Sequence, residues 1–437
     1  MPNDSRSDGA PDGADVDTDV AVVGAGIIGV ACALALARQG LRVTVIDGQE
    51  PGRGASYGNA GHLATEQVFP IADASILKRL PAMLMDPLGP LRLDWKHLPR
   101  ALPWFARLLL NLRPAPFRRT VAGIRALNEN SLDAWRRLLR SIGGEDLLVQ
   151  EGSLLVFERP ESRHAIDALR ARLEQEEVPV DTWRAGAVRD AAPQLSAHLQ
   201  GGLFFPRTGH FVDPYRVVLR LAEAAQACGV RFLRRQVRGG RLRDGGACAG
   251  GVALATSQGE LRARRVLIAC GAHSAGLTAQ LTGIRVPLDT ERGYHLSLPR
   301  EHGRLPFPVT SLERKFIMTP MAGGLRLAGT VEFAGLKRPA DLKRAWQLHR
   351  LSQGLFGADL DAGDATAWMG FRPSLPDSLP VIDRVCGGRV LLAFGHQHLG
   401  LTHAAVTAEW IGQLAAPPAA GAPRALPDLA AYRLDRF

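Results

Sequence analysis

The sequence predicts an α/β protein with a doubly wound, mostly parallel sheet. The chain has 437 residues, of which 46% are hydrophobic and 22% charged, enough for a buried core in two domains or one large α/β unit. An apolar strand, a Gly-rich turn and a helix follow one another between residues 19 and 40. The same succession recurs at residues 389–414.

The first of these regions reads as a βαβ unit. Residues 19–24 form a short apolar run that suits a strand buried on both faces. An Ala/Leu-rich helix is expected at 27–39 and is closed by Gly40. A second apolar strand is expected at 42–46 and ends in Asp47.

The glycines of this unit indicate dinucleotide binding. Gly24 permits the tight turn, Gly26 lets the backbone approach a pyrophosphate, and Gly29 lets helix and strand pack closely. The helix N-terminus offers N–H groups to the anion. Asp47 is placed to accept hydrogen bonds from the ribose hydroxyls. This fingerprint leaves FAD and a nicotinamide cofactor as alternatives.

Two later regions favour a bulky cofactor. The small-residue loop at 54–62 is suited to backbone running along such a molecule. A second buried strand is expected at 265–271. A third, at 389–395, leads through the turn at 395–402 into a helix at 404–414. A helix N-terminus at that turn would direct its partial positive charge toward an electron-rich ring of the cofactor.

Composition and spacing exclude several classes of protein. The longest apolar stretches are too short or too interrupted by glycine to cross a bilayer, and the acidic N-terminus lacks the basic start and apolar core of a secretory signal. The five cysteines are scattered without a C-x-x-C pair, so a reducing cytoplasm fits best. The net charge of +10 comes without nucleic-acid-binding spacing. We therefore expect no nucleic-acid partner.

At this point a family resemblance is plain. The sequence resembles the D-amino-acid oxidase superfamily of FAD-dependent amine oxidoreductases, and most closely its D-amino-acid dehydrogenase and D-hydroxyproline dehydrogenase branch. The resemblance spans residues 18–415. Besides the N-terminal fingerprint, it is carried by SYGNAG at 56–61, GHFVDP at 209–214, the strand region 265–274, RGY at 292–294, GFRP at 370–373, Pro376, Asp377, Pro380, Gly395, His396 and Gly400.

The resemblance implies a two-domain flavoprotein, with a doubly wound Rossmann-like FAD-binding domain and a mixed-sheet substrate domain. We expect the FAD-binding domain at 18–75, 205–285 and 366–415, and the substrate domain at 76–204 and 286–365. A disordered leader is expected at 1–17 and a C-terminal tail at 416–437.

FAD is the implied cofactor, held without a covalent bond. Gly58 stands where relatives with covalently attached flavin have histidine, and His62 comes four residues too late to replace it. Asp47 stands where flavoproteins more often have glutamate, which implies a shorter or water-bridged ribose contact. The cofactor-binding residues that we expect are Gly24, Gly26, Ile27, Ile28, Gly29, Asp47, Ser56, Asn59, Ala60, Gly61, Gly271, Gly395, His398, Leu399, Gly400, Leu401 and Thr402.

Four residues are candidates for the chemistry. An amino-acid carboxylate is best held by a planar guanidinium, and Arg372 matches the family's carboxylate-binding arginine; the alternative is a structural salt bridge. Tyr294 resembles a residue on a strand that faces the flavin ring. Side chains alternate along a strand, so only one of Tyr294 and His295 can lie on the face toward the ring. His396 is expected to bind the ring or the substrate, and His62 to border the substrate. No metal is expected, because the histidines at 396–403 lack a carboxylate or Cys in motif spacing.

The implied reaction is dehydrogenation of a D-amino acid or a cyclic imino acid of the D-proline or D-hydroxyproline type. A hydride passes from Cα to flavin N5 and an imine results, with no obligatory general base. The alternatives are a glycine/sarcosine-type amine oxidase, a nicotinamide-dependent dehydrogenase and a noncatalytic flavin-binding subunit. Oxygen, a quinone or a partner protein is the electron acceptor.

The segment 76–119 carries nine basic and two acidic residues among Leu, Met, Trp and Phe, and prolines break it repeatedly. Two interpretations follow. Short basic amphipathic pieces suit an anionic bilayer surface, which would make the cytoplasmic protein peripheral on the inner face of the cell membrane. Alternatively, the apolar residues pack on the substrate domain or on a second subunit.

Overall fold

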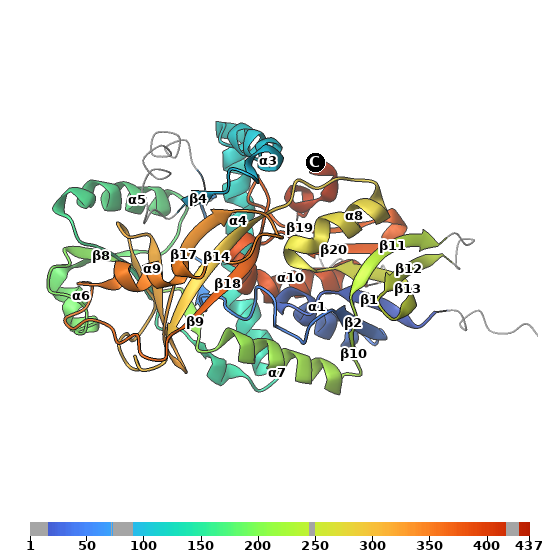
Figure 1. Ribbon diagram of the computed structural model, residues 1–437, viewed down its shortest axis with the longest axis horizontal. Helices are drawn as coiled ribbons and strands as arrows, with labels where there is room; N and C mark the ends of the chain where they lie inside the picture. The colour runs from blue at the N-terminus through green and yellow to red at the C-terminus, as the bar shows by residue number, and fades with distance from the viewer. Residues whose placement is uncertain (1–15, 71, 73–90, 244–249, 417–427) are drawn as a thin grey trace, which may run out of the picture.

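The computed structural model describes residues 16–70, 72, 91–243, 250–416 and 428–437. Two lobes lie side by side, each built on its own large sheet (Figure 1). Of the leader expected at 1–17, only residues 16 and 17 lie in the described part of the chain.

The first lobe contains an eight-stranded sheet whose centre is parallel. Its order begins β10-β2-β1-β13, and the long strand β13 then pairs in parallel with β20 and antiparallel with β12. Strand β19 borders β20, and β11 borders β12, both antiparallel. The strands are β1 (Thr18–Val23), β2 (Val43–Asp47), β10 (Arg231–Arg234), β11 (Val237–Arg243), β12 (Gly251–Thr256), β13 (Gly259–Ile268), β19 (Val381–Val385) and β20 (Val390–Phe394).

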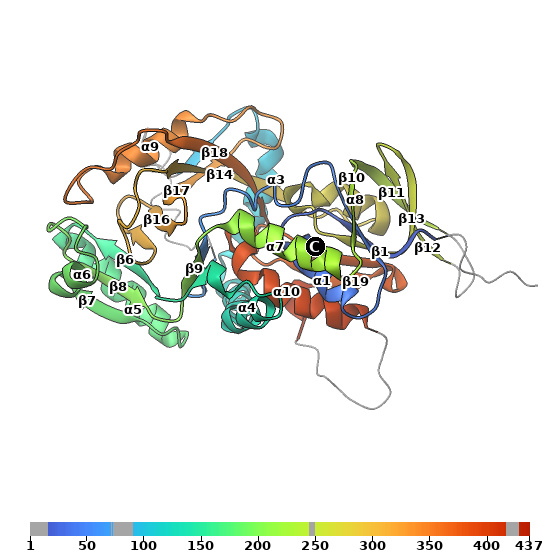
Figure 2. The same ribbon diagram turned by 90° about the horizontal axis from the view of Figure 1, so that it is seen from below.

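Strand β1 shows why this sheet is buried on both faces. Val20 and Val22 pack into one apolar cluster with α1 (Ile27–Ala37), α7 (Pro214–Ala227) and α10 (Gly400–Ala415). Ala21 and Val23 alternate with them and pack into another cluster with α8 (Ser274–Thr282). Helices therefore cover both faces, as in a doubly wound fold (Figure 2).

The parallel register brings four strand ends to one edge of the sheet. Val23 of β1 pairs with Ile46 of β2 and with Ile268 of β13, and Ile268 pairs with Leu392 of β20. The turns that follow these strands consequently lie together. Ligands of open α/β sheets bind at this carboxyl edge.

The second lobe is a nine-stranded mixed sheet. Its order is β18-β14-β17-β16-β15-β6-β8-β7, with β4 pairing to β17. Helices α9 (Lys343–Ser352), α5 (Arg163–Gln175) and α6 (Ala185–Ala191) pack on it. The strands are β4 (Leu91–Leu93), β6 (Ser153–Phe157), β7 (Asp181–Arg184), β8 (Gly201–Phe205), β14 (Asp289–Leu298), β15 (Val309–Ser311), β16 (Phe316–Met321), β17 (Gly324–Phe333) and β18 (Thr366–Ser374).

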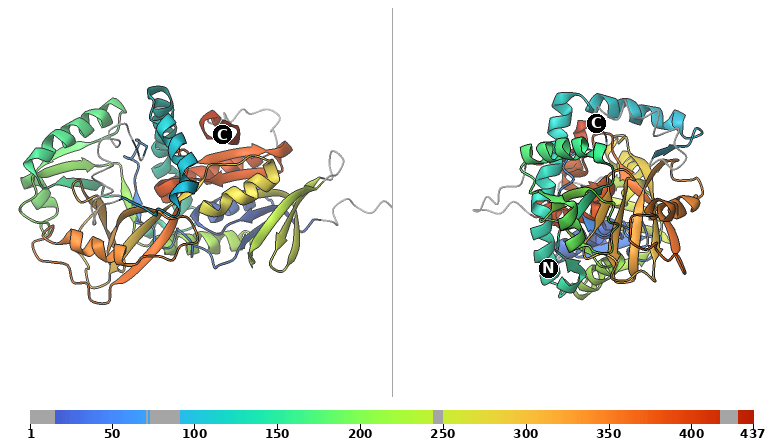
Figure 3. Two further views of the ribbon diagram at one scale, coloured as in Figure 1. Left: turned by 45° about the horizontal axis from the view of Figure 1, so that its top comes forward. Right: turned by 90° about the vertical axis from the view of Figure 1, so that its left-hand side faces the viewer.

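The described chain also contains a small third sheet and the helices α3 (Leu98–Asn111) and α4 (Pro114–Arg140). The small sheet has the order β3-β9-β5, with β3 (His62–Leu63), β9 (Gly209–Phe211) and β5 (Leu148–Val149). The long helix α4 follows α3 and packs against α10. Figure 3 shows α3 and α4 at the junction of the two lobes.

Two segments lie differently from the domain limits expected from the sequence. Strand β18 is an edge strand of the nine-stranded sheet, whereas the sequence assigns 366–415 to the FAD-binding part. Residues 428–437, expected in a tail, pack against the first lobe, where the Tyr432 hydroxyl donates to the Gly123 carbonyl at 2.7 Å. Tyr432 is 1% exposed, because its ring packs against Trp410.

Candidate active site

A cavity of about 1800 Å³ runs from the carboxyl edge of the eight-stranded sheet to the nine-stranded sheet. That volume exceeds the roughly 300–1,000 Å³ of an ordinary small-molecule pocket, so it has room for a dinucleotide and a substrate. Most of the cofactor-binding residues predicted from the sequence line it: Gly24, Gly26, Ile27, Ile28, Asp47, Ser56, Asn59, Ala60, Gly271, Gly395, His398, Gly400 and Leu401.

Four other predicted cofactor residues are not among those lining the cavity. A Cβ at Gly29 would lie 1.9 Å from the Gly24 carbonyl oxygen, so Gly29 allows the close helix–strand packing expected of it. Gly61 has φ +79° and donates its N–H to Asn59 Oδ1. Leu399 is buried in the apolar core. Thr402 accepts a hydrogen bond from the Ala64 N–H.

The end of the cavity near α1 fits a dinucleotide. The α1 N-terminus has no acidic residue in its first turn and no side chain capping it at Gly26, and its Ile27 N–H donates to Ser56 Oγ at 3.0 Å. Gly24 has φ +110°, and a Cβ there would lie 2.5 Å from the Ala269 carbonyl oxygen, so only glycine fits. The dipole at this helix end favours a pyrophosphate.

Asp47 ends β2 at the same part of the cavity. Its two carboxylate oxygens accept hydrogen bonds from the Ala25 N–H at 2.8 Å and the Gln49 N–H at 2.9 Å. Each oxygen keeps further acceptor capacity, since a carboxylate offers about four lone-pair sites. Asp47 can therefore hold ribose hydroxyls and fix the turn after β1 at once.

The loop at 54–61 is fixed to the second lobe. His295 donates from Nδ1 to the Gly58 carbonyl at 2.8 Å and stacks on Trp368, with ring centroids 5.1 Å apart. Arg326 donates to the Asn59 carbonyl at 2.7 Å. Burial lowers the pKa of Arg326 to about 10, and that of His295 to about 3. His295 is therefore neutral in this position.

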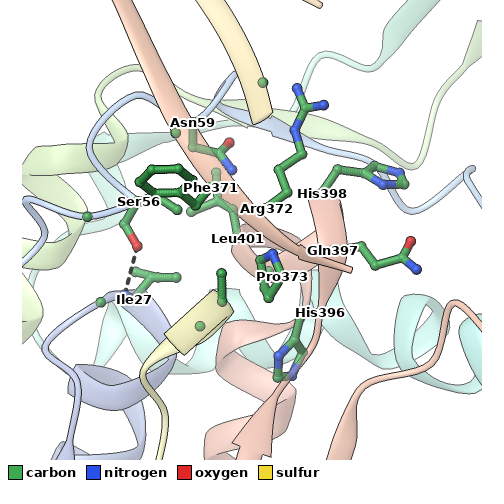
Figure 4. Close-up of a pocket in the computed structure, with 18 of the residues that line it drawn as sticks. Ile27, Ser56, Asn59, Phe371, Arg372, Pro373, His396, Gln397, His398 and Leu401 are labelled. Carbon is green, nitrogen blue, oxygen red and sulfur yellow. Dashed lines mark hydrogen bonds between the residues drawn. The ribbon is translucent and has the colours of Figure 1, made fainter. Parts of the chain in front are cut away.

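Arg372 reaches into the cavity from β18 (Figure 4). Its guanidinium lies across Gly293 of β14, where a Cβ would come within 2.4 Å of Arg372 Cζ. It donates to the Thr330 carbonyl at 3.2 Å. Among the described residues it has no carboxylate within salt-bridge distance; burial lowers its pKa, and the charge of Glu291 opposes that shift. Within the described part of the chain, Arg372 is thus a cation that lines the cavity and has no ion pair.

The neighbouring Glu291 was not among the site residues predicted from the sequence. It pairs with Arg372 in the register of β14 and β18, and it accepts a hydrogen bond from Ser374 Oγ at 2.5 Å. Burial raises its pKa, against the effects of Ser374 and Arg372. Glu291, Gly293 and His295 alternate along β14, and this period of two was the available signal.

The structure does not bring the Tyr294 hydroxyl to Arg372. The hydroxyl donates to Glu332 Oε2 at 2.6 Å and accepts from the Asp341 N–H, and the ring lies in the apolar core under α9. Burial raises the pKa of Tyr294 to about 12. Of the pair Tyr294 and His295, it is His295 that shares the β14 face of Arg372.

The histidines of the turn after β20 and of the start of α10 have different hydrogen-bond partners. His396 contacts Thr407 Oγ1 at 3.0 Å, His398 contacts Gln67 Oε1 at 2.7 Å, and His403 contacts Asn128 Oδ1 at 2.8 Å. Burial lowers the pKa of His396 to about 3. In Figure 4 the His396 ring points away from Arg372, whereas the His398 ring lies on the same side as Arg372.

His62, the fourth candidate, lines the cavity and forms a pair with Glu66. Its Nε2 lies 3.0 Å from Glu66 Oε1, and the His62 side chain is 6% exposed. Both residues line the cavity. The sequence prediction missed Glu66, although its position four residues after His62 was a usable signal.

Comparison with known proteins identifies the class of this fold and cavity. Residues 19–414 match the family model described as DAO, FAD dependent oxidoreductase. The chain belongs to this family of FAD-dependent oxidoreductases, which confirms the predicted resemblance, the two-domain α/β fold class and FAD as the cofactor.

Individual relatives cover nearly the full length. The chain is 36% identical over 405 residues to a protein named D-amino-acid oxidase from Bradyrhizobium diazoefficiens, covering 90% of this chain and 94% of that protein. It is 30% identical over 405 residues to a D-amino acid dehydrogenase from Dechloromonas aromatica, covering 90% and 96%. The crystal structure of glycine oxidase from Geobacillus kaustophilus superposes with a TM-score of 0.73 at 21% identity, covering 96% and 99%. That last likeness shows the shared fold.

Proposed function

We propose that this protein is a FAD-dependent enzyme that oxidises D-amino acids, including cyclic imino acids of the D-proline or D-hydroxyproline type. The observation that carries the proposal is Arg372, which lies in the cavity that also fits the dinucleotide and has no ion pair among the described residues. The 36% and 30% identities to proteins named D-amino-acid oxidase and D-amino acid dehydrogenase support the substrate class.

The chain's own residues would bind and orient the substrate. When bound, FAD supplies the hydride acceptor for the substrate Cα, and the substrate becomes an imine. Arg372 would hold the substrate carboxylate with two parallel hydrogen bonds. The apolar and aromatic walls, among them Trp368 and Phe371, would exclude water from the reacting carbon. From a primary amine the imine hydrolyses to a 2-oxo acid and ammonia.

A substrate panel tests this proposal. The purified yellow protein is mixed anaerobically with D-amino acids, their L-enantiomers, D-proline, hydroxyproline isomers, sarcosine and glycine, and the loss of flavin absorbance is followed. We expect reduction by D-amino or D-imino acids. Reduction by glycine or sarcosine alone would favour the amine oxidase alternative, and no reduction would favour a noncatalytic subunit.

The electron acceptor needs a separate measurement. After reduction by the best substrate, oxygen, a soluble quinone or an artificial dye is added and the return of flavin absorbance is timed. Rapid reoxidation by oxygen would define an oxidase. Rapid reoxidation by the quinone or dye alone would define a dehydrogenase that needs a quinone or a partner protein.

We also propose that α3 contacts an anionic membrane surface. No helix in the described part of the chain is both long and apolar enough to cross a bilayer. One face of α3 packs inward, where Trp104 is buried and donates to the Ser374 carbonyl. The other face carries exposed apolar side chains, Leu102 (55% exposed), Leu109 (49%) and Leu110 (52%), with Trp95 (72%) just before the helix.

A second segment adds to this surface. The Arg338 guanidinium pairs with Asp94 at 2.5 Å, so the loop before α9 lies beside β4. Leu336 and Leu342 of this loop and Trp346 of α9 are each at least 37% exposed. Basic residues accompany both segments: Lys96, Arg100 and Arg107, and Lys337 and Lys343. Residues 76–90 of the segment singled out in the sequence lie outside the described residues.

Vesicle sedimentation tests the membrane proposal. We expect salt-sensitive binding to anionic vesicles and none to neutral vesicles, with about 1 kcal/mol from each basic residue near the surface. Leu109→Glu with Leu110→Glu should abolish binding and leave flavin reduction unchanged. Absence of binding to either vesicle would leave packing against a second subunit as the interpretation.

A further inference from the structure

The turn after β20 directs His398 into the cavity by a strained backbone. Gly395 has φ +83° and Gln397 has φ +51°, a left-handed conformation that non-glycine residues rarely adopt. The buried Gln397 side chain donates to the Leu375 carbonyl at 3.0 Å and so holds the turn. As a result the His396 ring points toward Thr407 of α10, while the His398 ring lies by Arg372 (Figure 4). Both residues line the cavity.

The hydrogen bond of His398 fixes which ring nitrogen carries hydrogen. Its Nε2 lies 2.7 Å from Gln67 Oε1, and an amide oxygen only accepts. Nε2 therefore carries the hydrogen, and Nδ1 has a free lone pair. Among the residues that the structure describes, His398 forms its hydrogen bond through Nε2 and none through Nδ1.

Gln67 is itself held by a buried chain of hydrogen bonds. Asn128 of α4 donates from Nδ2 to the Gln67 carbonyl at 3.2 Å, which leaves Asn128 Oδ1 as an acceptor. His403 of α10 donates from Nε2 to that oxygen at 2.8 Å. Both Asn128 and His403 are buried. Two helices thus position the main chain that presents Gln67 to His398.

The charge state of His398 suits an acceptor. Burial lowers its pKa to about 3, and the positive charge of Arg372 acts in the same direction. The ring is therefore neutral at any pH at which an amino acid would be oxidised. Arg372 has only donors to offer, whereas His398 Nδ1 offers only an acceptor. An amino acid carries both complementary groups on one carbon.

We infer that His398 Nδ1 accepts a hydrogen bond from the substrate amino group while Arg372 holds the carboxylate. The inference rests on the proposed function and names a second point of attachment, which fixes the rotation of Cα about the carboxylate held by Arg372. A turn of the FAD-binding sheet and a strand of the substrate sheet then contribute one contact each. The sequence predicted that His398 contacts the cofactor. Such a contact alone would not require Nδ1 to be free to accept a hydrogen bond.

Two substitutions separate the two ring nitrogens. In His398→Gln the amide reproduces the Nε2 position and can still donate to Gln67, but the acceptor at Nδ1 is lost. In His398→Asn the amide oxygen reproduces the Nδ1 acceptor. Binding is measured on the FAD-loaded protein for the best D-amino acid of the panel, from the concentration dependence of anaerobic flavin reduction. Binding of the matching carboxylate without an amino group, propionate for D-alanine, is measured from the change in the flavin spectrum.

We expect His398→Gln to bind the D-amino acid roughly ten- to a hundredfold more weakly, the range for losing one buried hydrogen-bond partner, and to bind the carboxylate like the parent. His398→Asn should recover most of the amino-acid affinity. Gln67→Leu, which frees the ring, should show the same selective loss as His398→Gln. His349→Gln is the matched control, because His349 also uses Nε2, toward the Leu360 carbonyl, in the other lobe.

Equal weakening of the amino acid and the carboxylate in His398→Gln would assign His398 a structural role and overturn the inference. Unchanged affinity of His398→Gln for both the amino acid and the carboxylate would also overturn the inference. Failure of the proposed function looks different, because the parent protein itself would then not be reduced by any D-amino acid.

Discussion

Removal of the Arg372 guanidinium is the perturbation that bears most directly on the proposed function. In Arg372→Met the substrate carboxylate would enter a cavity without its counter-charge. Loss of one partner of a buried charge pair costs about 3–5 kcal/mol, or roughly two to three and a half orders of magnitude in affinity. Arg372→Lys keeps a charge but loses the planar fork. At about 1.5–3 kcal/mol for a hydrogen bond to a charged group, it should weaken binding roughly 10- to 150-fold.

The assay compares the concentration dependence of anaerobic flavin reduction in the parent and both variants, with FAD content determined from the absorbance spectrum. FAD should stay bound, because Arg372 belongs to β18 of the nine-stranded sheet and not to the α1 N-terminus that would hold the pyrophosphate. Arg300→Lys is the matched control, since Arg300 is 55% exposed and pairs with Asp364. If Arg372→Met bound substrate as the parent does, the carboxylate site would lie elsewhere.

Three further predictions follow from single contacts. A Cβ at Gly58 would lie 2.2 Å from Trp368, so no side chain fits at the position from which a covalent bond to the flavin would start. Acid precipitation should therefore release all the flavin into the supernatant. Yellow colour retained on the precipitated chain would contradict this. Gly293→Ala should push the Arg372 guanidinium aside and weaken substrate binding without loss of FAD, while Gly186→Ala, which has open space around it, should not. Tyr432→Ala removes a buried ring and should lower the free energy of unfolding by about 3–5 kcal/mol. Its midpoint of thermal unfolding should be lower than that of Arg433→Ala, the control at the exposed neighbouring residue. Equal midpoints would show that packing of the C-terminal segment contributes nothing to stability.

Local patterns account for the part of the fold that the sequence predicts well. The strand expected at 19–24 is β1 (Thr18–Val23), the helix expected at 27–39 is α1 (Ile27–Ala37), and the strand expected at 42–46 is β2 (Val43–Asp47). Each is a continuous apolar run ended by glycine or a polar residue, so neighbouring residues suffice to define it. The helix expected at 404–414 begins earlier, at Gly400, because the glycine turn continues directly into α10.

Contacts between distant residues account for what the sequence could not predict. Alternation left two choices on β14, and the pairing with β18 decides between them, because Glu291 lies opposite Arg372 and His295 lies opposite Trp368. Gln67 and His398 are separated by 331 positions, and no local pattern connects them. Tyr432 is a single aromatic residue in a short segment, so periodicity gives no sign of its burial.

Arg372 also has a consequence for selectivity. A second buried arginine, Arg292, donates to the carbonyls of Gly335, Arg338 and Pro339 and lies 3.7 Å from Glu332, so its charge is compensated by the protein. In the described ranges Arg372 donates to the Thr330 carbonyl alone, and any small carboxylate that reaches it relieves the cost of its burial. Carboxylate binding alone therefore cannot distinguish an amino acid from other organic acids. Discrimination has to come from groups that recognise the amine and the side chain, and the neutral acceptor on His398 is placed beside Arg372 to supply the first of these.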